Sequence, residues 1–151
     1  MTLATGGPDG PWAADVYFAE RDFALYFLSS ARSRHARELA AQPRCAVTVH
    51  PAPPTSWQQI TGLQLSGQAR ALTGTEAARA IATYLRKFPF AKDVIAHPGA
   101  TASRAANAAP FVFRPDRIRL IDNSRGFGRP FAADVLATGV LGNPTRDGRQ
   151  E

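Results

Sequence analysis

Hydroxyl and cationic side chains gather where an apolar run ends and a helical pattern begins. The run LYFL is followed by Ser29 and Ser30, and after a gap of two residues by Ser33, Arg34 and His35. Serine hydroxyls can donate hydrogen bonds to a phosphate, arginine can add two charge-assisted bonds, and a suitably protonated histidine can add one. The free N–H groups and the dipole at a helix start also attract anions. The combination indicates a phosphate site; the alternative is that Ser33 only caps the helix while Arg34 and His35 face solvent.

The neighbouring patterns place this junction between a strand and a helix. WAADVYFA and FALYFL are apolar runs split by the polar ERD, which predicts a hairpin with a short loop. Ser33 can cap a helix over residues 34–41, and Pro43 would end it.

Strand patterns and one long helical pattern fill the rest of the ordered sequence. MTLAT and CAVTVH predict strands, and QQITGLQLSGQARAL predicts the longest one because apolar and polar side chains alternate over residues 63–70. Apolar residues then recur at helical spacing until Pro89, and Thr73 and Glu76 have the spacing of a capping box. FVFRPDRIRLI restores the strand pattern around an expected turn at residues 114–116.

Together these patterns predict an α+β fold in one domain of residues 1–130. Successive hairpin-like strands favour an antiparallel sheet, and a small chain protects the sheet edges by curling into a barrel. We expect six or seven strands and two or three flanking helices. Residues 91–110 are alanine-rich and form either a third helical piece or a loop. Residues 131–151 lose periodicity and are expected to be a partly disordered tail.

Composition argues against several classes of partner. The 151 residues carry a formal net charge of +6, but the cations are scattered, and neither zinc-type Cys/His spacing nor an RNA-binding aromatic signature occurs. We therefore expect no nucleic-acid partner. Cys45 is the only cysteine, which predicts a reduced cytoplasmic protein with a buried, inert thiol. MTLATGG lacks the features of a signal peptide, and no apolar run approaches the roughly 20 residues of a membrane span, so we expect no membrane partner.

The order of the segments resembles a known family. A TLAT strand and a Gly-Pro turn precede the hairpin, S-S-x-x-S-R-H opens a helix that ends near Q-P-R, and G-L-Q-L-S-G-Q-A-R-A-L precedes an amphipathic helix. In this order the chain is similar to the flavin-binding split-barrel proteins related to pyridoxamine 5'-phosphate oxidase. The segment D-N-S-R-G-F-G, residues 122–128, is similar to one in the uncharacterised bacterial YhbP-type branch. The resemblance covers Met1 to about Arg129 and implies a mostly antiparallel split β-barrel.

The resemblance also implies a homodimer with two FMN molecules at its interface, each contacted by both subunits. The family's phosphate-binding segment falls on Ser29, Ser33, Arg34 and His35, where His35 replaces a lysine and makes the positive charge dependent on pH. The backbone that follows the flavin ring falls on residues 14–18. The cofactor-binding residues predicted in this way are Ala14, Asp15, Val16, Tyr17, Leu28, Ser29, Ser30, Ser33, Arg34, His35, Asn123 and Phe127.

Two departures from the family pattern argue against oxidation of pyridoxamine 5'-phosphate itself. Ala14 stands where the oxidase uses an arginine, and Gly62 where it uses a glutamine that contacts the ring. Because a flavin would carry the redox chemistry, no side chain is assigned as a catalytic acid or base. The main hypothesis is an oxidoreductase for an unidentified small molecule, with NAD(P)H or another electron donor. The alternatives are an F420-dependent enzyme, or a non-catalytic protein that binds flavin, binds haem through His50 or His97, or serves as a dimeric scaffold.

Overall fold

The computed structural model describes residues 1–151 except 52, 93–107, 129, 137–139 and 147–151. Within the described residues, all strand pairs are antiparallel and belong to one sheet of nine strands. In chain order the strands are β1 (Thr2–Gly7), β2 (Gly10–Asp15), β3 (Phe18–Arg21), β4 (Ala24–Ser30), β5 (Arg44–Val49), β6 (Thr61–Ala71), β7 (Ala108–Asp122), β8 (Phe131–Asp134) and β9 (Thr145–Arg146). The helices are α1 (Arg34–Ala41) and α2 (Gly74–Lys87), with short 3₁₀ turns η1 (Trp57–Gln59) and η2 (Asn123–Arg125).

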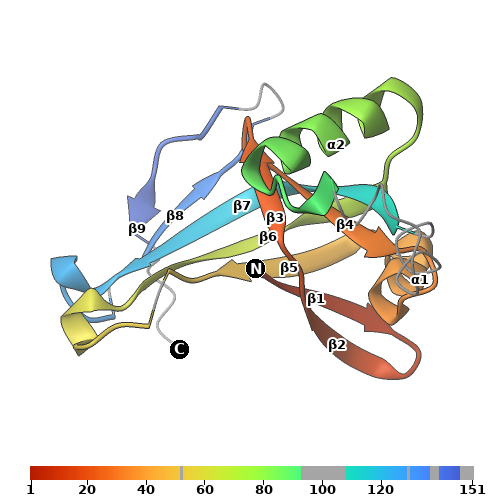
Figure 1. Ribbon diagram of the computed structural model, residues 1–151. Coiled ribbons are helices and arrows are strands. Elements are labelled where there is room, and N and C mark those ends of the chain that lie inside the picture. Colours follow the sequence, from red (N-terminus) through yellow and green to blue (C-terminus); the bar gives the residue numbers. More distant parts are fainter. Residues whose placement is uncertain (52, 93–107, 129, 137–139, 147–151) are drawn as a thin grey trace.

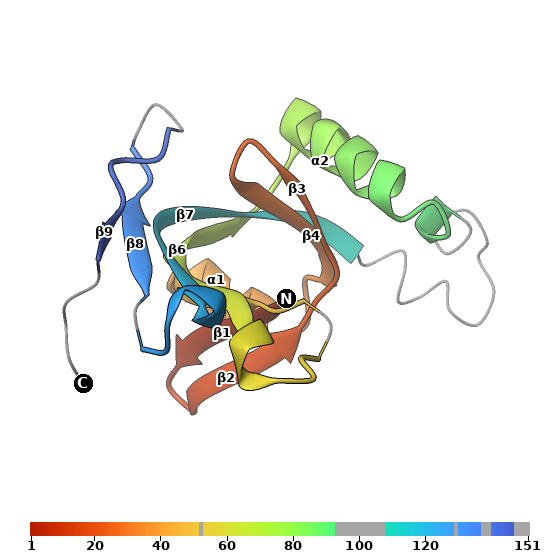
Figure 2. The same ribbon diagram turned by 90° about the vertical axis from the view of Figure 1, so that its left-hand side faces the viewer.

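The main path of the sheet runs β2-β1-β5-β6-β7-β4-β3, and β8 and β9 extend it from β7. The path curls around the core, but its two end strands, β2 and β3, do not pair with each other (Figure 2). This open seam gives the predicted α+β split barrel. The main path has seven strands, within the predicted six or seven, and β8 and β9 are additional. Helix α1 closes one end against β1 and β6, and α2 covers β3, β4 and β7 (Figure 1).

The core is built by the alternation that the sequence predicted. On β6, Leu65, Gly67 and Ala69 are buried while Gln64 and Gln68 are exposed. The inner faces of β4 and β7 add aromatic rings, and those of Phe27 and Phe111 stack with centroids 5.2 Å apart. The five largest fully buried side chains are Leu3, Phe27, Val47, Val112 and Phe113.

The two predicted helices form, but the predicted capping box at the second one does not. Helix α1 has the predicted bounds, 34–41. Thr73 is the N-cap of α2, yet its side chain makes no capping bond. Gly74, the first helical residue, has φ +58°, which turns the cap away from the usual geometry. The Glu76 carboxylate instead accepts two bonds from Arg70.

The apolar run WAADVYFA is two strands rather than the one that we predicted. β2 ends at Asp15 and pairs with β1, whereas β3 starts at Phe18 and pairs with β4. The alternation of inward and outward side chains continues between β2 and β3, but the strand with which the chain pairs changes from β1 to β4. The run therefore crosses the open seam of the barrel, which local periodicity does not reveal. The β3–β4 hairpin itself is as predicted.

The turn that we predicted at residues 114–116 is instead a β-bulge within β7. The register with β6 shifts between Ser66 and Gly67, so that Asp116 is an extra residue on β7. Pro115 cannot donate a ladder hydrogen bond, which explains the turn-like sequence. Gly67 allows the two backbones to approach closely, because a Cβ there would overlap the Arg114 carbonyl oxygen and lie 2.8 Å from Pro115 Cα.

The C-terminal segment contains strands that the sequence did not predict. β8 pairs with the end of β7, and β9 pairs with β8. Ala132 on β8 is buried, so part of residues 131–151 packs on the domain. A helical piece or loop was expected over residues 91–110. Its last three residues are instead the start of β7, Ala91 is buried, and residues 93–107 lie outside the described part of the chain, as do the last five residues of the expected tail. No described helix is long and apolar enough to span a membrane.

Candidate functional site

Three polar side chains lie close together at the junction between the end of β4 and the start of α1. His35 Nε2 lies 2.6 Å from Ser29 Oγ and 3.1 Å from Ser33 Oγ, and the two hydroxyl oxygens are 3.3 Å apart. His35 is only 8% exposed, so burial favours its neutral form. We call these three residues the junction triad.

The local sequence explains why the triad forms. A turn bonds the Ser33 N–H to the Ser30 carbonyl at 3.0 Å, which brings the chain back toward the end of β4. Ser33 then caps α1, with extended backbone (φ −64°, ψ 155°) and a hydroxyl that accepts from the Ala36 N–H at 3.3 Å. His35 is on the buried face of α1, directed toward Ser29. The Ser30 hydroxyl is used differently, since it accepts from the Arg32 N–H at 3.2 Å.

Arg34 belongs to a different set of contacts. Its Nε donates to Glu38 Oε1 at 2.7 Å, and its Nη2 donates to the carbonyls of Asp9 and Gly10 at 3.2 and 3.0 Å. The guanidinium also lies over the Trp12 ring, 4.8 Å from its centroid. Arg34 therefore ties α1 to the β1–β2 hairpin, and its Nε and Nη2 donate to Glu38 and the hairpin rather than to the triad.

The sequence analysis did not identify Glu38, the buried carboxylate that accepts a hydrogen bond from Arg34. Glu38 is 8% exposed and also accepts from Thr5 Oγ1 at 2.5 Å. The bond from Thr5, followed by the one from Arg34, lowers the pKa of this carboxyl group. Gly7 leaves room for it, since a Cβ there would lie 2.8 Å from Glu38 Oε1. The spacing of Arg34 and Glu38, four residues apart on a helix, was the available signal.

The buried state of His35 predicts a pH-dependent stability. Burial lowers the pKa of His35 below its ordinary value of 6.5, and the Glu38 carboxylate partly opposes this. Just below pH 6.5 the unfolded chain therefore binds a proton that the folded chain does not. The free energy of unfolding should fall as the pH drops through this window and should recover above it.

Thermal melts of the wild type and of His35→Gln, recorded between about pH 7 and 5.5, test this expectation. The melting temperature of the wild type should fall more steeply across that range, because glutamine does not titrate. Carboxylates titrate mostly below this window. Parallel profiles for the two proteins would contradict the assignment of a buried neutral His35.

The predicted ring-side segment, residues 14–18, lies at the same end of the sheet as the triad. Phe18 pairs with Phe27, so the residues just before Phe18 and just after Phe27, including Leu28, leave the β3–β4 pair at the same end. Ala14 and Asp15 end β2, whose outer side has no partner strand within the described residues. A free edge of this kind presents backbone N–H and C=O groups to a ligand.

The side chains of Asp15, Val16 and Tyr17 in this segment have different environments. Asp15 Oδ1 accepts from Thr2 Oγ1 at 2.7 Å, and Val16 packs on the core and exchanges backbone bonds with Met1. Tyr17 is 70% exposed, with its ring 5.7 Å from that of Phe88. Tyr17 is thus the side chain of this segment most available to a ligand or a second subunit.

A single chain does not bring Asn123 and Phe127 to the triad. Ser30 pairs with the first residue of β7, and Asn123 follows its last. At about 3.3 Å per residue, the 15-residue strand separates them by roughly 45 Å. Figure 1 shows α1 at one end of the molecule and the η1 and η2 turns at the other. There, Asn123 Nδ2 donates to the Trp57 carbonyl at 3.0 Å, and exposed Phe127 meets the Trp57 ring edge-on at 6.2 Å.

Two further residues clarify the departures from the family pattern. Gly62 is buried beside His50, and a Cβ at this position would lie 2.9 Å from His50 Nδ1. A glutamine at position 62 would displace His50. The packing around Gly62 therefore leaves no room for the glutamine that contacts the flavin ring in the oxidase. His97 lies outside the described residues.

The arrangement supplies groups that suit an anion. Burial raises the pKa of the Cys45 thiol to about 11, as expected for an inert thiol. Within the described part of the chain, no group of three or more His, Cys, Asp or Glu side chains could hold a metal ion. The triad supplies two hydroxyls, an imidazole and the N-terminal end of α1, which are groups that hold phosphates.

Comparison with known proteins agrees with the fold. Residues 1–122 match the family described as pyridoxamine 5'-phosphate oxidase. The UPF0306 protein YhbP of Salmonella paratyphi A is 34% identical over 120 residues, which cover 78% of this chain and 73% of that protein.

Two solved structures are also similar. A haem-binding protein from Mycobacterium smegmatis has a TM-score of 0.70 and 27% identity; the match covers 88% of this chain but about half, 51%, of that one. A pyridoxamine 5'-phosphate oxidase-related, FMN-binding protein from Nostoc punctiforme has a TM-score of 0.64 and 15% identity, and the match covers 96% of this chain and 84% of that one. At this identity the second likeness concerns the fold alone.

Proposed function

The chain belongs to the pyridoxamine 5'-phosphate oxidase family, alongside the bacterial UPF0306 proteins, and we propose that it binds FMN and acts as a flavin-dependent oxidoreductase. The observation that carries this proposal is the junction triad at the start of α1. Its substrate is a small molecule other than pyridoxamine 5'-phosphate, since Ala14 and Gly62 lack the polar ring contacts of the oxidase. NAD(P)H or another donor supplies electrons, and the lone Cys45 fits a reducing cytoplasm.

The chemistry of the triad and its place at the start of α1 support binding of the phosphate group of FMN there. The hydroxyls of Ser29 and Ser33 can turn from each other toward a phosphate oxygen, and His35 can donate from Nε2 once it is protonated. The helix start adds backbone N–H groups and a favourable dipole. A bound dianion would raise the pKa of His35, so FMN should bind more tightly as the pH falls toward 6.

The ring of the flavin would lie along the free edge of β2. Backbone groups of the ring-side segment other than those of Val16, which bond Met1, would hydrogen-bond the ring edge, and exposed Tyr17 would cover part of its face. When bound, the flavin supplies the electron transfer. The protein's part is to hold the phosphate, orient the ring and exclude water.

We further propose that FMN lies between two copies of the chain. Asn123 and Phe127 are at the opposite end of the barrel from the triad, so only a second copy could bring them to the same cofactor. Exposed aromatic side chains at both ends, Tyr17 at one and Trp57 and Phe127 at the other, fit such an interface.

Absorbance and fluorescence of the purified protein, before and after addition of FMN and washing, test the proposal. We expect a retained flavin spectrum near one per chain and a particle of twice the chain mass in light scattering. Parallel titration with F420 distinguishes the two ring systems. Complete loss of flavin on washing, with no saturable binding in titration, would overturn the proposal.

A haem-binding role is the second candidate, favoured by the likeness to the Mycobacterium smegmatis protein. Within the described residues, His50 is the one exposed histidine, since His35 is buried in the triad. Haem titration should give a strong visible absorption band if this role applies, and His50→Ala should then shift that band. The same titration without a band would leave FMN as the ligand to pursue.

A further inference from the structure

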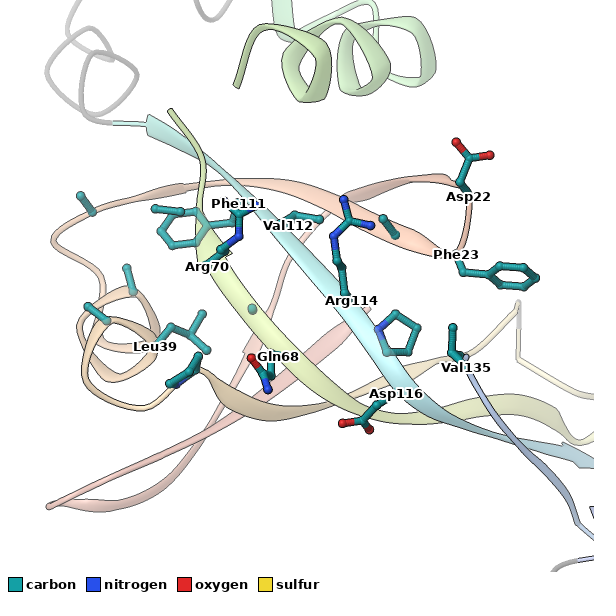
Figure 3. A pocket seen from close by; sticks show the side chains of 18 of the residues that line it. Asp22, Phe23, Leu39, Gln68, Arg70, Phe111, Val112, Arg114, Asp116 and Val135 are labelled. Carbon is teal, nitrogen blue, oxygen red and sulfur yellow. The ribbon is translucent and has the colours of Figure 1, made fainter. Parts of the chain in front are cut away.

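A cleft separate from the junction triad lies over β6 and β7. Its volume is about 760 Å³. Leu39 and its neighbours on α1 form one side, and Asp22 and Phe23 of the β3–β4 turn form the other, with β6 and β7 between them (Figure 3). Val135 and Leu136 close the end beyond β7. None of the residues predicted to bind FMN lines this cleft.

The walls of the cleft are mostly apolar. The accessible apolar surface comes from exposed lining residues: Ala40 and Pro43 at the α1 side, Ala71 on β6, and Phe23 and Leu136. Leu39, Phe111 and Val112 lie beneath them and are nearly fully buried. The volume lies within the roughly 300–1,000 Å³ typical of small-molecule sites. An apolar body of the size of a medium-length acyl chain or a two-ring aromatic would therefore fit.

One cationic side chain on the floor of the cleft, that of Arg114, lacks a counter-ion among the described residues. Gln68 pairs with Arg114 across the β6–β7 ladder, and Arg70 is two residues from Gln68 on the same face. Arg70 is already bonded to the Glu76 carboxylate, at 2.9 and 3.1 Å. Among the described residues, Arg114 has no hydrogen-bond or ion-pair partner. Its guanidinium is an open bidentate donor, and Figure 3 shows it directed away from the Gln68 amide.

The two carboxylates at the cleft do not balance Arg114, because each has a cationic partner of its own. Asp116 bonds Arg44 and also accepts from Ser66 Oγ at 3.0 Å. Asp22 pairs with Arg21 at 3.2 Å. The cleft thus combines apolar walls with one available cation.

Phe23 is held at the rim in a conformation that costs energy. Asp22 and Phe23 have φ of 53° and 59°, as both central residues of a type I′ hairpin turn require. Glycine is the favoured second residue of such a turn, and a bulky side chain with positive φ is strained. The Phe23 side chain nevertheless lines the cleft and stays 39% exposed, so the fold gains little from its burial.

We propose that this cleft binds an amphipathic organic anion, with its apolar body between α1 and Phe23 and its carboxylate or equivalent group on Arg114. This explains three features together: the apolar walls, the unpaired guanidinium and the strained phenylalanine. The site is independent of the proposed flavin site.

Fluorescence titration with 1-anilinonaphthalene-8-sulfonate, an aromatic anion, tests the proposal directly. We expect saturable binding, with decanoate displacing the probe at least tenfold more effectively than decanol, which has the same chain without the charge. Arg114→Gln should weaken decanoate about tenfold and leave decanol unchanged, since a partly exposed charge-assisted bond is lost. Ser29→Ala, in the junction triad, should leave probe binding unchanged.

Phe23→Gly gives a second measurement that does not depend on charge. Glycine suits the turn, so the melting temperature should stay the same or rise, while affinity for the probe falls severalfold. Equal displacement by decanoate and decanol, unchanged affinity in Arg114→Gln, or a loss of probe binding in Ser29→Ala would each overturn the proposal.

Discussion

Gly67→Ala should lower the free energy of unfolding by roughly 2–3 kcal/mol, because a new methyl group would overlap backbone atoms of the neighbouring strand. The nearest atoms are the Arg114 carbonyl oxygen and, at 2.8 Å, Pro115 Cα. Backbone cannot rotate away as a side chain end can, so β6 and β7 would have to separate at the bulge. Chemical denaturation of the variant measures this loss, and the melting temperature should fall by roughly 4–12 °C.

Gly6→Ala is the matched control for this substitution. Gly6 is also a strand glycine without positive φ, but no heavy atom lies within 4 Å of its ideal Cβ position. Alanine there should leave stability unchanged or raise it slightly, by reducing the freedom of the unfolded chain. Equal effects of the two substitutions would show that the close approach at the bulge does not require glycine.

The double variant Ser29→Ala, Ser33→Ala should weaken FMN binding about a hundredfold. Each hydroxyl is expected to donate one bond to the phosphate, and hydrogen bonds to charged groups contribute about 1.5–3 kcal/mol each. A tenfold change in affinity corresponds to about 1.4 kcal/mol. Flavin fluorescence titration at pH 7 measures the change directly.

Two comparisons separate loss of the site from loss of the fold. Ser33 also caps α1, so its replacement should lower stability by about 1 kcal/mol, whereas Ser29→Ala alone keeps the cap and should still weaken FMN about tenfold. Ser66→Ala makes the same chemical change on β6, where the hydroxyl donates to Asp116, and should leave FMN affinity unchanged. Wild-type affinity in Ser29→Ala would place the phosphate elsewhere.

Local patterns predicted the elements that depend on local sequence. The bounds of α1 followed from Ser33 and Pro43, and the inner face of β6 followed from strict alternation. The break between β2 and β3 could not be predicted, because it marks a change of partner strand and leaves the side-chain period intact. The bulge at Asp116 was mistaken for a turn because Pro115 disfavours both a helix and a regular ladder.

In the candidate site, too, local contacts were predictable from the sequence and long-range contacts were not. The sequence placed Ser29, Ser33 and His35 together because all three lie within a stretch of seven residues. It did not predict that Arg34 turns to the β1–β2 hairpin, since Asp9 and Gly10 are about 25 residues away in the chain. Nor did it identify the cleft at Arg114, whose walls come from segments between Asp22 and Leu136 that only the fold assembles.

The position of β7 in the sheet has a consequence for synthesis of the protein. In the sheet, β3 and β4 connect with β1, β2, β5 and β6 only through β7. β7 begins at Ala108 of a 151-residue chain, so when the first 107 residues have left the ribosome, the facing edges of β4 and β6 are both still unpaired. The barrel can therefore close only late in translation, and a chain that stalls before β7 presents two open edges to chaperones, proteases and other nascent copies.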